Sequence, residues 1–548
     1  MRVPEAVAAT LAGLGADTVF GVVGSGNFHV TNALISQGAR YIAARHEGGA
    51  ACMADGWART ARRTGLLTVH QGPGLTNAVT GITEAAKSRT PLLVLAADVA
   101  GAAVTSNFRI DVAALTAAVG ATPERLHSPA SAAADAARAY HAATLQRRTV
   151  VLAMPLDVQA GECARQPPAA GPVLGPVAPA ADAADALAAA LARARRPVFV
   201  AGRGARLAQA GPDLERLAAA CGALLATSAA AKGLFRGSPW DLDVSGGFAT
   251  PLTAELIGAA DLIVGWGCAL NMWTMRHGTL IGPEATVVQV DDDPAAIGAH
   301  RPVHLGVLGD AAETARAALA ALGDRFGTGV GYRTEEVRSR IAGEGRWRDV
   351  PYADESGGGR IDPRTLSIAL DDLLPAERTV CVDSGNFMGY PSMFLSVPDA
   401  DGFCFTQAYQ SIGLGLASAI GAAIARPDRL TVAALGDGGA LMSVSELETA
   451  ARLGLGLLIV VYDDEAYGAE VHHFGPDGHP LDVVRFPATD IAEIGRGFGC
   501  AGVTVRGPED LTPVRDWLAD PRDRPLVVDA KITGDRGAWW LEEAFRGH

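Results

Sequence analysis

Short runs of apolar residues, separated by stretches with helical periodicity, recur along the whole chain. In residues 1–160 these runs are DTVFGVV, RYIAA, GLLTVH, PLLVLAAD and TVVLAMP. Their alternation with helix-length segments predicts βαβ units around a mostly parallel sheet. We therefore expect the first third of the chain to form an α/β domain.

The same alternation returns twice more along the chain. A second block contains RPVFVAGRGA, ALLATS, DLIVGWG and ATVVQVDDDP, and a third contains RTVCVDSG, RLTVAALGDGG, LLIVVYDDE and PLVVDAKI. Residues 165–181 are rich in Pro, Ala and Gly and residues 327–359 are polar, so linkers are expected there, the second with one helix at TEEVRSRIAG. The prediction is an α/β chain of three doubly wound parallel-sheet domains, at 1–163, 182–325 and 360–548, ending in a short tail from residue 534.

Composition and charge favour a large cytoplasmic enzyme. Of the 548 residues 49% are hydrophobic and 19% charged, which suits several buried cores and excludes intrinsic disorder. A net charge of −14 argues against nucleic acid as a partner, because phosphate binding needs a basic face. Seven scattered cysteines and a start without a leader pattern indicate reduced thiols in the cytoplasm. The uncharged run 402–425 contains polar residues and glycines, so it is expected to be a buried loop and helix, with no membrane span.

Candidate chemistry gathers at two strand ends of the last block. Gly436-Asp437-Gly438-Gly439 follows the apolar run LTVAAL and precedes the helical pattern SELETAARLG. Glycines at such a turn let the backbone approach a phosphate, and an aspartate there suits a Mg²⁺ that bridges protein and diphosphate. The run LLIVVY ends in Asp463-Asp464, so oxygens from both strand ends can meet on one cation. The alternative is an ordinary glycine turn with solvated acids.

These residues resemble the signature of thiamine-diphosphate (ThDP) enzymes. The resemblance implies that the Asp437 and Asp464 side chains and the Ala466 carbonyl hold Mg²⁺. This family usually has Asn-Asn where this chain has Asp463-Asp464. The additional carboxylate is expected to strengthen Mg²⁺ binding and to weaken cofactor binding when the metal is scarce.

The N-terminal block carries a second, longer resemblance. Arg45-His46-Glu47 and the segment HQGPGLTNAVTGITEAAKSRTPLLVLAAD at 70–98 resemble the pyrimidine-binding domain of acetohydroxyacid synthases and related 2-oxoacid decarboxylases. In that family the glutamate after Arg-His hydrogen-bonds N1′ of the aminopyrimidine and promotes the imino tautomer, which removes the thiazolium C2 proton; Glu47 is the matching position. The family's pyrimidine-binding, middle Rossmann-like and diphosphate-binding domains would cover nearly the whole chain. Its active sites lie between subunits, which implies a homodimer or homotetramer.

The resemblance also implies a set of cofactor contacts. Ile412 matches the large apolar residue that bends the cofactor into a V, although an interior isoleucine is more often plain core. The Gln410 carbonyl would accept from the 4′-amino group. The remaining implied contacts are Pro73, Asn77, Asn386, Phe387, Gly436, Gly438, Gly439, Tyr467 and Gly468.

Several polar residues are expected on the substrate side. Ser25 and His70 resemble the serine and one histidine of benzoylformate decarboxylase, and Gln71 follows His70. The alternative for His70 is a satisfied core histidine. Arg109 replaces the glutamine of acetohydroxyacid synthases and either clamps an anionic substrate or pairs with Asp111. Glu470 matches the acid of pyruvate decarboxylases.

The expected function is that of a ThDP- and Mg²⁺-dependent enzyme that decarboxylates a small 2-oxo acid. The resulting enamine is then protonated or ligated to a carbonyl acceptor. Acetolactate synthase of branched-chain amino-acid synthesis is an alternative, and a 2-hydroxyacyl-CoA-lyase-like enzyme is another, because GCALNMWTMRHG at 267–278 resembles that group. FAD is doubtful, since this segment lacks the arginine and aspartate run of the flavin-containing synthases. A non-catalytic regulator with the same fold is a third alternative, against which the intact Glu47 and Asp437 argue.

Overall fold

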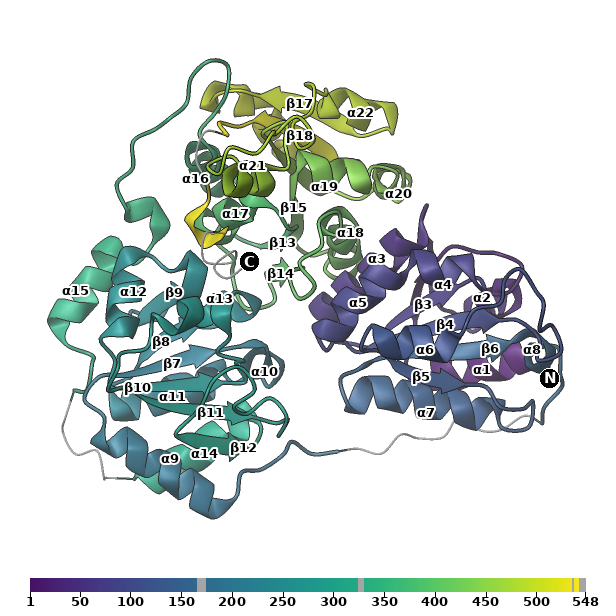
Figure 1. Ribbon diagram of the computed structural model, residues 1–548, viewed down its shortest axis with the longest axis horizontal. Helices are drawn as coiled ribbons and strands as arrows, with labels where there is room; N and C mark the ends of the chain where they lie inside the picture. Colours follow the sequence, from purple (N-terminus) through teal and green to yellow (C-terminus); the bar gives the residue numbers. More distant parts are fainter. Residues whose placement is uncertain (165–173, 324–329, 535–536, 542–548) are drawn as a thin grey trace.

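Three parallel β-sheets organise the molecule. The computed structural model describes residues 1–164, 174–323, 330–534 and 537–541. Its described residues contain three sheets of six strands each, all paired in parallel and with helices between most successive strands (Figure 1). The predicted fold class is confirmed. The limits of the domains stay a prediction, and residues 165–173 of the first expected linker lie outside the described residues.

The first sheet has the strand order β2-β1-β3-β4-β6-β5. Its strands are β1 (Thr18–Gly21), β2 (Arg40–Ala43), β3 (Gly65–Val69), β4 (Leu92–Asp98), β5 (Thr122–Arg125) and β6 (Thr149–Pro155). The helices around it are α1 (Val3–Gly13), α2 (Phe28–Ser36), α3 (Glu47–Ala61), α4 (Pro73–Asn77), α5 (Val79–Lys87), α6 (Val112–Ala118), α7 (Ala132–Leu145) and α8 (Leu156–Gln159).

The second sheet has the order β12-β11-β10-β7-β8-β9. Its strands are β7 (Pro197–Ala201), β8 (Leu224–Thr227), β9 (Asp241–Val244), β10 (Leu262–Trp266), β11 (Thr286–Asp291) and β12 (Leu305–Leu308). Its helices are α9 (Ala181–Arg193), α10 (Arg203–Leu207), α11 (Gly211–Cys221), α12 (Pro251–Gly258), α13 (Met272–Met275), α14 (Ala311–Leu322) and α15 (Glu335–Glu344). The helix predicted at TEEVRSRIAG is α15, and its Val337 and Ile341 join the apolar core of this domain.

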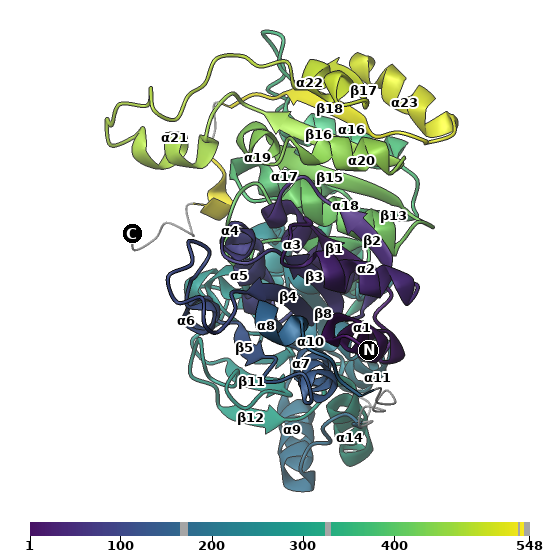
Figure 2. The same ribbon diagram turned by 90° about the vertical axis from the view of Figure 1, so that its right-hand side faces the viewer.

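The third sheet has the order β14-β13-β15-β16-β18-β17. Its strands are β13 (Arg378–Val382), β14 (Phe403–Phe405), β15 (Leu430–Gly436), β16 (Leu457–Asp463), β17 (Ala501–Val505) and β18 (Leu526–Lys531). Its helices are α16 (Pro363–Leu373), α17 (Gly389–Phe394), α18 (Gly415–Ala425), α19 (Asp437–Met442), α20 (Glu446–Arg452), α21 (Gly468–Phe474), α22 (Ile491–Gly497) and α23 (Thr512–Ala519). In the side view this domain lies above the first, and α21 projects to one side (Figure 2).

The first and third domains share one apolar core. It includes buried side chains of α3 and α18, two helices that pack closely side by side (Figure 1). Glycines make this approach possible, because a Cβ at Gly56 would collide with the carbonyl of Ser418 and one at Gly421 with that of Met53. The contact fixes helix α3 against the domain that carries the GDGG motif.

The uncharged run 402–425 and the C-terminal tail are both packed into the molecule where the structure describes them. Residues 402–425 form β14, a loop and the buried helix α18, and among the described residues no helix is long and apolar enough to cross a membrane. The described part of the expected tail is also packed: Trp540 is fully buried and lies against Phe248, while the Trp539 indole N–H donates to the Gly247 carbonyl at 3.0 Å. Two large aromatic side chains explain this, since their burial releases much apolar surface from water.

Candidate active site

The GDGG motif and the Asp463-Asp464 pair lie at the same edge of the third sheet. Strands β15 and β16 are hydrogen-bonded neighbours in which Gly436 faces Tyr462. Parallel strands end at one edge, so Asp437, directly after β15, lies beside the acids that end β16. The motif was expected to form a turn that precedes the helix. Instead, helix α19 already begins at Asp437, with Gly436 as its N-cap.

The carboxyl groups of Asp437 and Asp464 at this edge both have raised pKa values, although the charge of Arg360 acts to lower that of Asp464. Burial, followed by the charges of Asp464 and Asp463, raises the pKa of Asp437 to about 8. Burial and the charge of Asp463 raise the pKa of Asp464 to about 7. Hard oxygen donors that resist ionisation in this way are suited to a divalent cation, whose charge would stabilise both carboxylates. This donor set therefore fits Mg²⁺.

The additional acid at the end of β16 has its own counter-ion. Asp463 is 1% exposed and forms a buried ion pair with Lys531 at the end of β18. The Lys531 ammonium also donates to the Thr489 carbonyl at 2.7 Å and lies 3.1 Å from Asp529. Burial works to lower the pKa of Lys531, but the two carboxylates outweigh it and the pKa is raised. Lys531 is thus shared between Asp463 and Asp529 and offsets part of the negative charge beside the expected diphosphate.

Glycines leave room for a ligand next to these acids. A Cβ at Gly468, the first residue of α21, would collide with Asp464 and lie 3.2 Å from Asn386. One at Gly438 would collide with the Tyr467 ring. The main chain around Ala466 is fixed by a β-bridge to Arg485: the Phe486 amide donates to the Glu465 carbonyl at 2.8 Å, and the Tyr467 amide donates to the Val484 carbonyl at 2.9 Å. These glycines let Asp464 and Tyr467 pack closely, and Gly436, Gly438 and Gly468 line the same cavity as Asp437 and Asp464. Backbone without side chains at this edge fits the phosphate end of ThDP.

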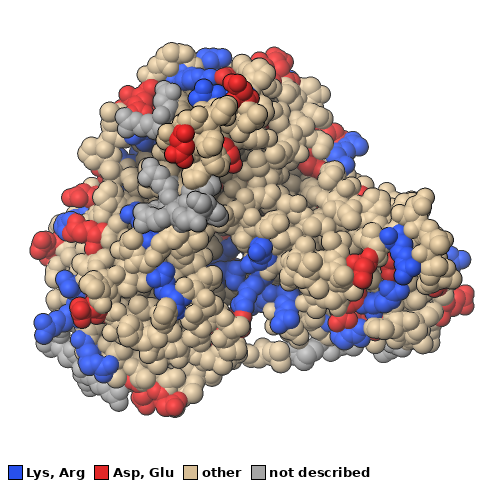
Figure 3. Space-filling model, in the orientation of Figure 1, with Lys and Arg blue, Asp and Glu red and all other residues tan. Residues whose placement is uncertain are grey.

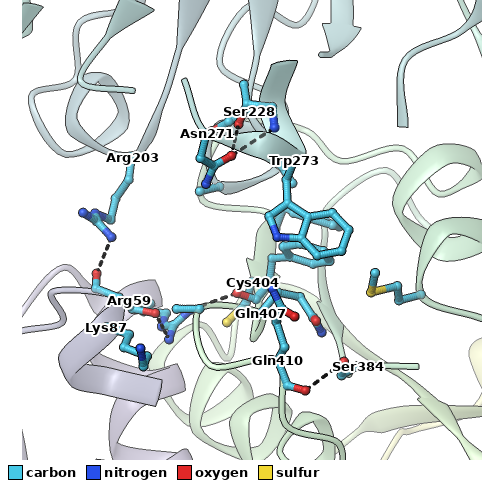
Figure 4. Close-up of a pocket in the computed structure, with 18 of the residues that line it drawn as sticks. Arg59, Lys87, Arg203, Ser228, Asn271, Trp273, Ser384, Cys404, Gln407 and Gln410 are labelled. Carbon is cyan, nitrogen blue, oxygen red and sulfur yellow. Dashed lines mark hydrogen bonds between the residues drawn. The ribbon is translucent and has the colours of Figure 1, made fainter. Parts of the chain in front are cut away.

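A loop between β14 and α18 carries Gln410 and Ile412. Gln410 adopts a left-handed conformation with φ of 60°, which is uncommon for a residue other than glycine. Buried Asp383 accepts hydrogen bonds from the amides of Gly413 at 2.9 Å and Leu414 at 3.2 Å, so the far end of the loop is anchored. Ser384, next to Asp383, lies 3.5 Å from the Gln410 carbonyl (Figure 4).

A second group of polar residues surrounds the start of helix α3 in the first domain. Glu47 is the first residue of α3 and accepts a hydrogen bond from the Asn77 amide at 3.1 Å. Burial raises the pKa of nearby Tyr41, and the charge of Glu47 adds to this rise. A Cβ at Gly74 would lie 3.5 Å from Glu47 and 3.1 Å from His70, so these side chains converge on the turn that begins α4 with Pro73.

His70 is held in one orientation by the loop after β1. Its Nδ1 accepts from the Gly26 amide at 3.1 Å, so in the neutral ring the proton is on Nε2. Burial lowers the pKa of His70, while the charge of Glu47 acts in the opposite direction. Asn27 fixes the same loop through the Thr68 hydroxyl and the Val22 carbonyl, at 3.1 and 3.0 Å. Ser25 lies in this loop, between Gly24 and Gly26, and is exposed.

The other expected substrate residues lie around this pair. Gln71 is buried, and its Oε1 has no hydrogen-bond partner among the described residues. The Phe108 ring meets His70 edge-on at 5.3 Å. Arg109 is exposed and donates to the Val104 carbonyl, while Asp111 caps helix α6 by accepting from Ala114. These contacts differ from the Arg109–Asp111 pair that was one of the two alternatives.

The two groups do not line one cavity within a single chain. A cavity of about 1350 Å³ between the three domains is lined by Asp437, Asp464, Gln410 and Glu470. Among the described residues that line it there is none of the group around Glu47. Basic side chains gather in the hollow between the domains (Figure 3), and Arg59 and Arg203 enter it from α3 and α10 (Figure 4). Burial, together with the charges of Arg89 and Arg59, lowers the pKa of Arg203 to about 10.

Two neighbours of the expected residues were not singled out from the sequence. Lys531 ends the apolar run PLVVDAK, so the rule that parallel strands end at one edge already hinted at its place beside Asp463. Tyr41 is a half-buried residue of the strand run RYIAA, and nothing in that run marks it as a site residue. Its proximity to Glu47 depends on how β2 and α3 pack.

Comparisons with known proteins agree with this geometry. Family models of thiamine pyrophosphate enzymes match residues 1–115 (N-terminal TPP binding domain), 184–318 (central domain) and 383–530 (C-terminal TPP binding domain). A probable 2-ketoarginine decarboxylase of Pseudomonas aeruginosa is 31% identical over 524 residues, covering 92% of this chain and 89% of the relative. The chain belongs to the thiamine pyrophosphate enzyme family.

Other members of the thiamine pyrophosphate enzyme family are similar over their full length. A sulfoacetaldehyde acetyltransferase of Rhodobacter capsulatus is 29% identical, covering 99% of this chain and 96% of the relative. The large subunit of acetolactate synthase isozyme 2 of Escherichia coli is 28% identical, with 96% and 95% covered. The solved structure of a ThDP-dependent 4-hydroxybenzoylformate decarboxylase of Rhodococcus jostii has the same fold, with a TM-score of 0.82, 21% identity and 97% and 99% covered. The chain is thus an enzyme of the decarboxylase and acetolactate synthase type.

Proposed function

We propose that this chain binds ThDP through Mg²⁺ and decarboxylates a small 2-oxo acid. The observation that carries the proposal is the pair Asp437 and Asp464, two buried carboxyls of raised pKa beside a glycine cradle. In this proposal their side chains and the Ala466 carbonyl hold the metal. The diphosphate lies against the backbone of the cradle, and the further cofactor contacts are Asn386, Phe387, Gln410, Ile412, Gly436, Gly438, Gly439, Tyr467 and Gly468.

The proposal places the active site between two subunits. Glu47 and Asp437 belong to one chain, yet only Asp437 lines the cavity between its domains. A second copy would bring its Glu47, with Pro73 and Asn77, to the aminopyrimidine of a cofactor whose diphosphate the first copy's Asp437 would help to hold through Mg²⁺. A homodimer is then the smallest active unit, and a tetramer of two such dimers is equally compatible with it.

Within such a site Glu47 acts as the proton relay to N1′ of the aminopyrimidine. Bound ThDP supplies an electron sink for the carbon–carbon bond next to the substrate carbonyl. Ser25, Gln71 and Arg109 bind the substrate carboxylate and carbonyl, with Arg109 as the cation. Neutral His70 donates from Nε2, since its Nδ1 accepts from Gly26, and exchanges a proton at the reacting carbon or oxygen together with Glu470.

Substrate profiling tests this function. Purified protein with ThDP and Mg²⁺ is incubated with pyruvate, an aryl 2-oxo acid and 2-ketoarginine, the last because of the decarboxylase relative. Carbon dioxide and organic products are followed by mass spectrometry, with Asp437→Ala as the inactive control. We expect CO₂ from at least one acid; an aldehyde product indicates protonation and a longer hydroxyketone indicates carboligation. Cleavage of an acyl-CoA without CO₂ from any 2-oxo acid would overturn the proposal.

A further inference from the structure

Glu84 of the first domain binds the loop of the third domain that carries Gln410. Glu84 lies in α5 and its side chain is 2% exposed. Its Oε2 accepts from the Tyr409 amide at 2.7 Å, and its Oε1 from the Ala408 amide at 3.2 Å. Both amides immediately precede Gln410. A carboxylate buried at a domain junction is costly unless it is paired, so these contacts need a cation nearby.

Arg59 of helix α3 supplies that cation. Its guanidinium donates to Glu84 at 2.8 Å, to Asp55 at 2.9 Å and to the Phe405 carbonyl at 3.0 Å, and the Ser88 hydroxyl bridges Arg59 and Glu84. Burial works to raise the pKa of Glu84, but Arg59 and the two loop amides outweigh it, and the pKa is lowered. Glu84 is therefore ionised at neutral pH. The chain that carries Gln410 is thus bound at two places: Arg59 donates to the Phe405 carbonyl, and Glu84 accepts from the Ala408 and Tyr409 amides.

The loop is thus anchored on both sides of its strained residue. Glu84 holds the amides before Gln410, and Asp383 holds those of Gly413 and Leu414 after Ile412. Gln410 between them keeps its left-handed φ of 60°, a conformation that persists only where the surroundings impose it. The two anchors come from different domains, so the loop conformation depends on the junction between them.

We propose that Glu84 and Arg59 are positioning residues, which hold the Gln410–Ile412 loop in its binding conformation before the cofactor binds. This inference rests on the proposed function, because it assigns that loop to the cofactor. Neither side chain needs to touch the cofactor. Their effect is to remove loop ordering from the free-energy cost of binding.

The test compares Glu84→Gln with Asp401→Asn. Asp401 is also a carboxylate at the junction of the first and third domains, paired with Arg62 at 2.6 Å and Arg206 at 3.4 Å, but it accepts no hydrogen bond from the loop among those described. ThDP affinity is measured by calorimetry at saturating Mg²⁺, and amide hydrogen exchange is followed on the peptide 403–414. We expect Glu84→Gln to weaken ThDP binding by about 10-fold or more and to speed exchange at 408 and 409. Asp401→Asn should stay within about 2-fold of wild type in both measurements.

Ser88→Ala is a second, milder variant, which tests the same pair if Glu84→Gln does not fold. It loosens the pair without changing charge, so we expect faster exchange at the same amides and about 3-fold weaker ThDP binding. Unchanged ThDP affinity in Glu84→Gln, or equal losses in Glu84→Gln and Asp401→Asn, would overturn the inference. So would an affinity loss without faster exchange in the loop. Failure of the proposed function looks different: wild type itself would bind no ThDP, while the exchange rates would still show whether Glu84 holds the loop.

Discussion

At the scale of single residues, Glu47 makes few contacts besides those of its proposed role in proton transfer. It begins α3, accepts one hydrogen bond from Asn77 and is only partly buried, so its removal leaves the core intact. A side chain in such a place contributes through its ionisation far more than through packing.

Glu47→Gln should therefore abolish turnover while cofactor binding survives. The amide keeps the shape and one hydrogen bond but cannot carry the proton, so we expect a loss of about 10²-fold or more in kcat and ThDP affinity within a few-fold. Exchange of the cofactor's C2 proton, measured by NMR, should slow in parallel. Glu448→Gln, which alters a half-buried acid paired with Arg45 and Arg452, is the matched control and should behave as wild type. Unchanged C2 exchange in Glu47→Gln would refute the assignment.

His70 should set an acidic limit of activity below its ordinary pKa of 6.5. The folded pKa is lowered, so the neutral form persists as the pH falls through 6.5 and is lost only further down; protonation also breaks the bond from Gly26 to Nδ1. We expect the acid limb of kcat/KM to have its midpoint below 6.5. His70→Asn, which keeps an acceptor for Gly26, should lower kcat and remove that limb. A midpoint above 6.5 in wild type would contradict this account.

At the scale of elements, the ends of β15, β16 and β18 form one electrostatic unit. Asp437 and Asp464 have raised pKa values and fit a bound cation, whereas Asp463 forms an ion pair with Lys531.

Lys531→Met should make ThDP binding depend strongly on Mg²⁺. The uncompensated Asp463 repels a diphosphate, so at limiting Mg²⁺ we expect about 10-fold weaker ThDP binding, with recovery at saturating metal. The double variant Asp463→Asn/Lys531→Met removes both charges and should restore the wild-type response. Calorimetric titration of ThDP at several Mg²⁺ concentrations measures this. Equal behaviour of Lys531→Met and wild type would show that the ion pair does not shield the site.

The sequence predicts the interior strands of each sheet and misses most of the edges. β5, β9, β12, β14 and β17, which match none of the predicted apolar runs, all lie at sheet edges. Edge strands are covered less completely, as the alternating exposure of β5 illustrates, so they lack the continuous apolar run of a buried strand. Site residues with a local motif, such as Asp437, were predictable. Glu84 was not, because its role arises from Tyr409, hundreds of positions away, which only the packing of the domains brings close. The place of Lys531 at the sheet edge was predictable, but its pairing with Asp463 depends on the strand order.

For the whole molecule, the decisive feature is that the groups around Glu47 and Asp437 lie apart. If each active site takes one group from each of two chains, inactive variants of the two groups should rescue each other. Equal amounts of Glu47→Gln and Asp437→Ala subunits, refolded or co-expressed together, should regain about a quarter of wild-type activity, because half of the dimers are mixed and each has one intact site. Two variants of the same group, such as Asp437→Ala with Asp464→Ala, are the control and should stay inactive. Absence of rescue would argue for sites within one chain.

The separation of the two groups also has a genetic meaning. Loss-of-function alleles of this gene should fall into two complementation classes, one for each half of the site, although the gene encodes a single polypeptide. Alleles from different classes would restore growth when combined, whereas alleles of one class would not. A chain damaged in both halves would be worse than a deletion, since it would occupy a healthy partner and silence both sites of the pair. Such an allele would be dominant.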